Sequence, residues 1–144
     1  MRLGARMIFQ LKSILPLALQ LPQRDLKLLM AEDNEINRKL ASMVFKRQNL
    51  SLDLVSNGQE ALDAVQKQRY DLVFMDIEMP VMGGIDATHK INATLGADAP
   101  PIVALTAHTM DGDRERFMAE GMKGYLTKPI NTQELNQLIE TLVS

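Results

Sequence analysis

Residues 72–80 read LVFMDIEMP, an apolar run that ends at the carboxylate of Asp76. A run that is apolar throughout is typical of a central strand buried on both faces of a parallel sheet. Ligands of such sheets bind beyond the carboxyl ends of the strands. Asp76 is therefore predicted to lie at the ligand-binding edge of a buried strand, where a carboxylate can act as a nucleophile.

Polar or charged residues also follow three other apolar runs. They are Glu32 and Asp33 after residues 28–30, Thr106 after residues 102–105 and Lys128 after residues 125–127. Mg²⁺ prefers carboxylate ligands and keeps waters beside substrate phosphates, while a hydroxyl and an ammonium can hold phosphoryl oxygens. The set predicts phosphoryl chemistry on Mg²⁺. Lys128 precedes Pro129, so a cis peptide bond is accessible there and is expected to aim the ammonium inward.

From Leu26 onward, short apolar runs alternate with segments of helical period, as in βα units on a parallel sheet. The expected strands are residues 27–30, 51–55, 72–75, 102–105 and 125–127. The second of these alternates apolar and polar residues, so we expect it at a sheet edge with one wet face. The fold class is a doubly wound α/β sandwich.

Helix boundaries are marked by capping residues. Asn57 and Asn131 each stand three residues before a glutamate, as in a capping box, and Gly121 suits the end of a helix. The last helix carries an apolar stripe that we expect to lie on the sheet, formed by Leu135, Leu138, Ile139 and Leu142. The helix after Asn34 shows a similar stripe, formed by Ile36, Leu40 and Val44.

Composition excludes several classes of protein. The chain of 144 residues fits one domain, and 46% hydrophobic residues are ordinary for a globular protein. A net charge of -2 provides no overall positive field for nucleic acid or anionic lipid, so we expect neither as a partner. The absence of cysteine excludes disulfides and thiolate metal sites, and it is compatible with the reducing cytoplasm, where we expect the protein.

Residues 1–25 differ from the rest and are read as a linker or a remnant of a preceding segment. Lys12 interrupts the apolar part of this segment, which argues against a secretory signal. The run at residues 14–21 is far shorter than the roughly 20 residues that span a bilayer, so no membrane contact is expected. The sharper alternative is an amphipathic docking helix around Ile8, Leu11 and Leu15.

Four motifs together resemble the receiver domain of response regulators, most closely those attached to hybrid sensor histidine kinases. They are MAEDNEINR at residues 30–38, MDIEMP at 75–80, ALTAH at 104–108 and YLTKP at 125–129. The likeness spans residues 26–143, and the expected receiver domain is residues 26–144. One departure is Gly83, at a position where such domains often have a polar residue, and it bears on the stiffness of the loop after Asp76.

The resemblance implies a flavodoxin-like (βα)5 fold with strand order 2-1-3-4-5. It implies that Asp76 accepts a phosphoryl group, and that Mg²⁺ lies between Glu32, Asp33, Asp76 and the backbone carbonyl of Glu78. Thr106 and Lys128 would contact the phosphoryl oxygens. Phosphorylation would pull Thr106 inward and turn Tyr125, the switch aromatic, which remodels the face from Met110 to Tyr125.

The implied phosphoryl donor is a histidine kinase or a histidine phosphotransfer protein, in the cytoplasm or in the cytoplasmic part of a membrane-bound kinase. No output domain follows the last helix in this sequence, so we expect output through a partner on the Met110–Tyr125 face. The domain would not be an enzyme with turnover, beyond Mg²⁺-dependent self-phosphorylation and autodephosphorylation.

Two other functions fit part of the pattern. Asp76 and Glu78, two residues apart after a strand, also occur in hydrolases that form an aspartyl phosphate, although this chain lacks room for their cap. A docking module that never meets phosphate is the second, and the complete acidic set argues against it. A flavin-binding domain of the same topology is discarded, because the acids after the first strand would repel a flavin phosphate.

Overall fold

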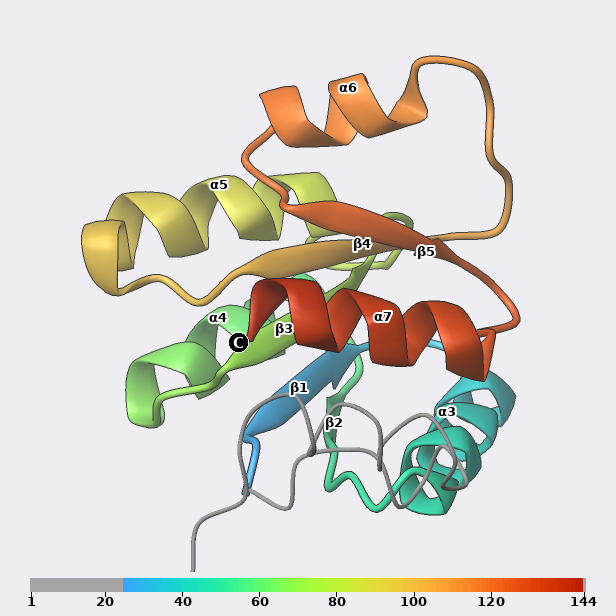
Figure 1. Cartoon of the computed structure of the whole chain (residues 1–144). Coiled ribbons are helices and arrows are strands. Elements are labelled where there is room, and N and C mark those ends of the chain that lie inside the picture. Colours follow the sequence, from blue (N-terminus) through green and yellow to red (C-terminus); the bar gives the residue numbers. More distant parts are fainter. Residues whose placement is uncertain (1–24, 144) are drawn as a thin grey trace, which may run out of the picture.

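The computed structural model describes residues 25–143, so the expectations for residues 1–24 lie outside the described part. Five strands form one parallel sheet in the order β2-β1-β3-β4-β5, which confirms the expected topology (Figure 1). The strands are β1 (Leu28–Ala31), β2 (Asp53–Val55), β3 (Leu72–Asp76), β4 (Ile102–Thr106) and β5 (Gly124–Thr127). Each lies where the sequence predicted one, with β2 beginning two residues later.

Five α-helices cover the two faces of the sheet in the described part of the chain (Figure 1). They are α3 (Glu35–Arg47), α4 (Gly58–Lys67), α5 (Gly84–Leu95), α6 (Asp113–Ala119) and α7 (Thr132–Leu142), with a short 3-10 turn, η1 (Gly96–Asp98), after α5. Helices α4, α5 and α6 pack on one face, and α3 and α7 on the other. Burial on both faces explains why β3 is apolar from Leu72 to Met75, before it ends at Asp76.

The helix boundaries follow the expected caps. The side chains of Asn57 and Asn131 accept hydrogen bonds from the N–H groups of Glu60 and Glu134 at 2.9 and 3.0 Å. Gly121 follows α6 with a φ of 95°, which glycine adopts at little cost. In the last helix, Leu135 and Ile139 are buried and Leu138 and Leu142 pack against the same core, as predicted.

The prediction for the stripe on α3 is wrong for Ile36 and Leu40, whereas Val44 packs against the core as predicted. Ile36 and Leu40 are 68% and 51% exposed, whereas Ala41 and Phe45 are the residues that α3 buries. Phe45 meets Phe74 of β3 edge to face, with ring centroids 5.3 Å apart. The rotation of α3 is therefore set by the aromatic pair, and an apolar strip of Ile36, Leu40 and Met43 faces outward.

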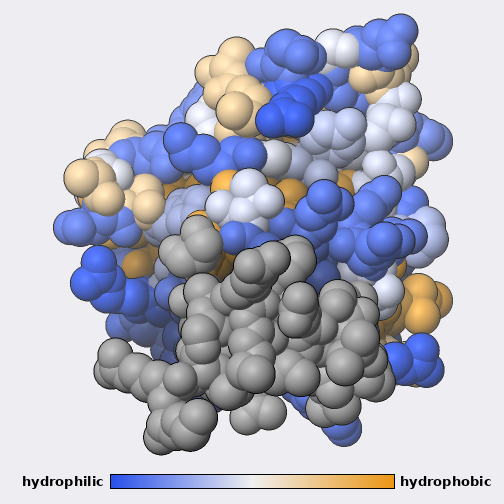
Figure 2. All heavy atoms as spheres, in the orientation of Figure 1, coloured by the Kyte–Doolittle hydropathy of each residue, from blue (hydrophilic) through white to orange (hydrophobic). Residues whose placement is uncertain are grey.

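The surface on one face of the molecule is mostly polar where it is described. Hydrophilic residues cover most of the described surface on the face drawn in Figure 2, and hydrophobic residues form small separate groups. In the part of the chain that the structure describes, no helix is long and apolar enough to cross a membrane.

Candidate functional site

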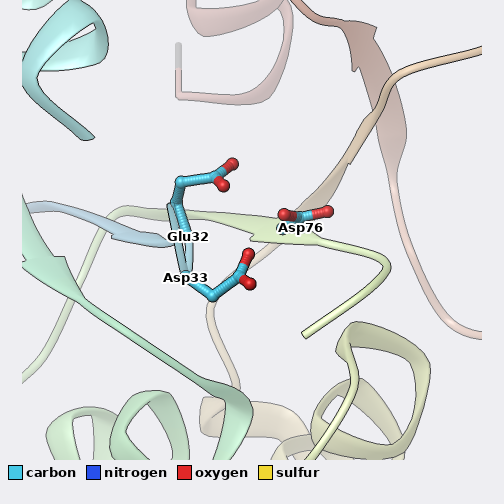
Figure 3. Close-up of side chains that lie close together, drawn as sticks. All are labelled: Glu32, Asp33 and Asp76. Carbon is cyan, nitrogen blue, oxygen red and sulfur yellow. The ribbon is translucent and has the colours of Figure 1, made fainter. Parts of the chain in front are cut away.

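The ends of β1 and β3 bring three carboxylates together. The parallel register pairs Ala31 with Met75, so the next residues, Glu32 and Asp76, lie side by side. Asp33 joins them from the loop that leads to α3, and Figure 3 shows the three side chains gathered around one space. One oxygen from each of the three residues lies within 4.8 Å of the others, a spacing that a metal ion can bridge.

Lys128, just after β5, bridges two of these acids. Its Nζ donates to Glu32 Oε2 at 3.0 Å and to Asp76 Oδ2 at 3.1 Å. The Lys128–Pro129 peptide bond is cis, as predicted. Burial disfavours the ammonium, but hydrogen bonds to Glu32 and Asp76 outweigh it and raise the pKa of Lys128 above its ordinary value. Lys128 is therefore a fixed cation facing the acidic cluster.

Glu32 is buried and ionised. Burial raises its pKa, but hydrogen bonds from Lys128, from the Asn34 N–H and from Asn37 outweigh burial, so the pKa lies below its ordinary value. The Asn34 N–H and Asn37 Nδ2 donate to Glu32 Oε1 at 3.2 and 3.3 Å, while Oε2 accepts from Lys128. Both oxygens of Glu32 thus have partners in the protein.

Asp76 is held differently. It is only 5% exposed, and burial followed by the charge of Glu32 raises its pKa from 3.8 to about 6, against the opposing effects of Lys128 and the Glu78 N–H. That N–H donates to Asp76 Oδ1 at 3.2 Å. At neutral pH the Asp76 carboxylate is mostly ionised and more basic than an ordinary aspartate, which suits a nucleophile.

Two other expected residues, Thr106 and Tyr125, lie in the neighbouring strands β4 and β5. Thr106 is the last residue of β4, and its hydroxyl donates to the His108 carbonyl oxygen at 2.7 Å. Tyr125 in β5 is half-buried, and its ring centroid lies 6.0 Å from that of Phe117 in α6. The structure therefore places Thr106 on the same sheet edge as Asp76 and places Tyr125 against the helix that follows β4.

Asn37 and Arg38 were not assigned a role from the sequence. Asn37 contacts the Glu32 carboxylate, and Arg38 Nη1 donates to the backbone carbonyls of Glu32 and Asp33 at 2.8 and 2.9 Å. Their sequence signal is their place in the motif MAEDNEINR at residues 30–38, which carries the resemblance to receiver domains. Asn37 and Arg38 lie in the first turns of α3 and are half-buried.

The chain is similar to known proteins in sequence and in fold. The family described as response regulator receiver domain matches residues 28–140. Hybrid signal transduction histidine kinase I of Dictyostelium discoideum is 38% identical over 125 residues, which cover 81% of this chain and 7% of that protein. Sensor protein GacS of Pseudomonas syringae pv. syringae is 37% identical over 122 residues, covering 83% of this chain and 14% of that protein. The chain thus spans a small part of these curated relatives.

Two solved structures are similar in sequence and fold. One is the receiver domain of Saccharomyces cerevisiae Ssk1 in a co-crystal with the histidine phosphotransfer protein Ypd1, with 30% identity and a TM-score of 0.75 over 83% of this chain and 89% of that one. The other is the receiver domain of sensor histidine kinase PA1611 of Pseudomonas aeruginosa, with magnesium coordinated in its active site cleft. That structure has 33% identity and a TM-score of 0.74, covering 83% of this chain and 98% of that one.

Proposed function

Since the chain belongs to the family of response regulator receiver domains, we propose that Asp76 accepts a phosphoryl group from a phosphohistidine and so relays a two-component signal. The observation that carries this proposal is the buried Asp76 carboxylate, 3.1 Å from the Lys128 ammonium and next to two further acids at the ends of the strands. This arrangement combines a nucleophile, a cation site and a fixed positive charge.

The residues fit a magnesium ion. Glu32, Asp33 and Asp76 offer hard carboxylate oxygens within bridging distance of one another, and we propose the backbone carbonyl of Glu78 as a further ligand. Magnesium, when bound, offsets negative charge in the cleft and on an incoming phosphoryl group. The coordinated magnesium in the PA1611 receiver supports this assignment.

In the proposed transfer, an Asp76 oxygen forms a bond to phosphorus while the bond between phosphorus and the donor imidazole nitrogen breaks. The nitrogen keeps the electron pair of that bond. Lys128 then donates to a phosphoryl oxygen in place of the Asp76 oxygen that it contacts now. Thr106 gives up its bond to the His108 carbonyl and donates to a second phosphoryl oxygen.

The same movement of Thr106 provides the switch. Its shift toward Asp76 opens space beside β5, and Tyr125 turns into that space, which remodels the face from Met110 to Tyr125 for an output partner. The contact between Tyr125 and Phe117 supports this route, because it links β5 directly to α6 within that face.

The phosphoryl donor must bring a histidine close to Asp76. We propose that it docks on the α3 surface, which we define as Ile36, Leu40 and Met43, three exposed apolar side chains on a helix that begins beside the acidic cluster. A hollow of about 420 Å³ lies between this helix and the residues after Lys128, and Glu32 and Lys128 also line it. The co-crystal of Ssk1 with Ypd1 supports a histidine phosphotransfer protein as partner.

We further propose that the domain is phosphorylated once and loses phosphate slowly, without turnover of a substrate. We place it in the cytoplasm, alone or in the cytoplasmic part of a membrane-bound kinase, because its relatives include sensor kinases. The aspartyl-phosphate hydrolase remains the second candidate, and it rests on Asp76 with Glu78 two residues later.

Intact mass spectrometry after incubation with acetyl phosphate and Mg²⁺ tests the function. We expect one added phosphoryl group on the native chain and none on Asp76→Asn or in EDTA. No adduct on the folded native chain, with no phosphate released, would leave a docking module. Continuous release of phosphate by the native chain would favour the hydrolase.

A further inference from the structure

Arg38 reaches back from α3 to the loop that carries the acids. Its Nη1 donates to the carbonyl oxygens of Glu32 and Asp33 at 2.8 and 2.9 Å, so one guanidinium nitrogen joins two consecutive peptide groups. Hydrogen bonds from a charged donor are shorter and stronger than neutral ones. Arg38 therefore restrains the peptide groups on both sides of the Asp33 Cα.

Asn37 restrains a side chain of the same pair of acids. Its Nδ2 donates to Glu32 Oε1 at 3.3 Å, and its own N–H donates to Asn34 Oδ1 at 3.0 Å. The Asn34 N–H in turn donates to Glu32 Oε1 at 3.2 Å. The Glu32 carboxylate is thus tied to the first turn of α3 at one oxygen and to Lys128 at the other.

This restraint answers a geometric problem. Successive side chains of an extended strand point to opposite faces, yet Glu32 and Asp33 must direct their carboxylates into one cleft with Asp76. Three neighbouring anions also repel one another, and that repulsion favours an open loop. A bent loop that keeps the Glu32 and Asp33 carboxylates beside Asp76 needs hydrogen-bond donors that hold it in place. Among the described residues of α3, Asn37 and Arg38 provide such donors.

We propose that Asn37 and Arg38 are positioning residues that hold Glu32 and Asp33 in the arrangement that binds the divalent cation. The proposal rests on the proposed function, because the cation site is part of that function. Neither residue needs to touch the cation or the phosphoryl group. Partners of metal ligands commonly contribute 10- to 100-fold to metal affinity through such contacts.

The sign of the effect distinguishes positioning from charge. Arg38 is a cation close to the cation site, so by Coulomb's law alone its removal would tighten Mg²⁺ binding. Loss of positioning has the opposite effect. Lys39 is the matched control, because it is the next cation on α3, is exposed, and pairs with Glu35 at 3.5 Å and not with the loop.

Isothermal titration with Mg²⁺ of the native chain, Arg38→Gln, Arg38→Lys, Asn37→Ala and Lys39→Gln tests the proposal. We expect Arg38→Gln to weaken Mg²⁺ binding about tenfold or more and Asn37→Ala to weaken it less. Arg38→Lys should recover part of the loss, and Lys39→Gln should bind as the native chain does or slightly tighter. Arg38→Gln and Asn37→Ala should need a higher Mg²⁺ concentration for phosphorylation by acetyl phosphate. At saturating Mg²⁺ their phosphorylation rate should equal that of the native chain.

Mg²⁺ binding by Arg38→Gln as tight as or tighter than that of the native chain would overturn the proposal. A phosphorylation rate of Arg38→Gln that stays below the native rate at saturating Mg²⁺ would also overturn it. Circular dichroism checks that each variant is folded, and Asn37→Ala keeps the test in force if Arg38→Gln unfolds. If the native chain binds Mg²⁺ and is phosphorylated, and the Arg38 and Asn37 variants bind Mg²⁺ equally well, this inference is wrong and the proposed function stands. If the native chain neither binds Mg²⁺ nor gains phosphate, both the proposed function and this inference are wrong.

Discussion

Asp76 carries a charge that its surroundings disfavour. Its pKa is raised from 3.8 to about 6, so the folded chain holds this proton more tightly than the unfolded chain does. Below about pH 4 the group is protonated in both states and the cost is absent. The contribution of Asp76 to the free energy of unfolding therefore falls as pH rises from about 4 to about 6, because the unfolded chain loses this proton before the folded chain does. Above about pH 6 the charged carboxylate leaves the fold less stable than the protonated form would.

Replacing Asp76 by asparagine should stabilise the fold at neutral pH. One pKa unit corresponds to about 1.4 kcal/mol, and the loss of the Lys128 contact offsets part of the gain, so we expect about 1 to 2 kcal/mol at pH 7.5. Near pH 4 the gain should almost vanish. Urea unfolding in EDTA, followed by circular dichroism, measures the difference. An equal effect at both pH values would contradict the assigned pKa.

Val81 has an unusual backbone conformation in the loop after β3. Its φ is 68°, a value that costs a β-branched residue about 1 to 2 kcal/mol, and its side chain is 84% exposed. Val81→Asn should therefore raise stability by about 1 kcal/mol, because asparagine tolerates this region. Val81→Ala is the control, since alanine keeps most of the cost. Equal stability of Val81→Asn and Val81→Ala would refute the argument.

Helix α5 begins directly against the end of β3. A Cβ at Gly84 would clash with the Asp76 carbonyl oxygen, and the Gly84 N–H donates to the Ile77 carbonyl at 3.0 Å. An added methyl group must therefore displace the backbone at Asp76. This close approach is a tertiary constraint, because alanine is otherwise favoured over glycine in a helix.

Gly84→Ala should lower stability by more than about 2 kcal/mol and slow phosphorylation, whereas a free helix would gain about 1 kcal/mol from the same change. Gly83→Ala is the control. Its φ is -73° and an added Cβ would lie 3.3 Å from the Ile77 carbonyl oxygen, which needs to move only a few tenths of an ångström, so we expect a loss of about 1 kcal/mol or less. Denaturant midpoints compare the two, and a stable Gly84→Ala with native phosphorylation would contradict the tight contact.

The element boundaries were largely predictable. Caps such as Asn57 and Asn131 act within one turn, and the buried strands are recognised as continuous apolar runs. Both signals are local properties of the chain. The face of α3 was not predictable in the same way. Its apolar residues surround much of the helix, and only the packing of Phe45 on Phe74 selects which of them are buried.

For the molecule as a whole, the α3 surface predicts that one substitution affects transfer from a protein donor and transfer from a small donor differently. Leu40→Glu should slow transfer from a phosphorylated histidine phosphotransfer protein by about tenfold or more, because a charge would be buried against that partner. Phosphorylation by acetyl phosphate should stay within about twofold of native, because this small donor needs no docking surface.

Met118→Glu is the matched control, since Met118 is an exposed apolar residue on α6, a helix on the other face of the sheet. Both rates can be followed by intact mass, with a phosphotransfer protein that is active on the native chain. Equal rates for Leu40→Glu and Met118→Glu with the protein donor would place docking elsewhere.

The positions of the candidate site residues follow from the chain alone. Apolar runs that end in Glu32, Asp76, Thr106 and Lys128 meet at one sheet edge, because parallel strands share the direction of their carboxyl ends. The membership of the acidic cluster was thus accessible from the sequence pattern, and the order of the strands from the resemblance. The structure confirms the order and brings the acids together.

Tertiary structure alone decided the electrostatics and the exposed surfaces. The raised pKa of Asp76, the bridge from Lys128 and the hold of Arg38 on two carbonyls depend on burial and on groups brought from distant parts of the chain. The outward face of α3 has the same origin. Sequence spacing specifies local periodicity and caps, whereas desolvation and long-range contacts exist only once the sheet and its helices have packed.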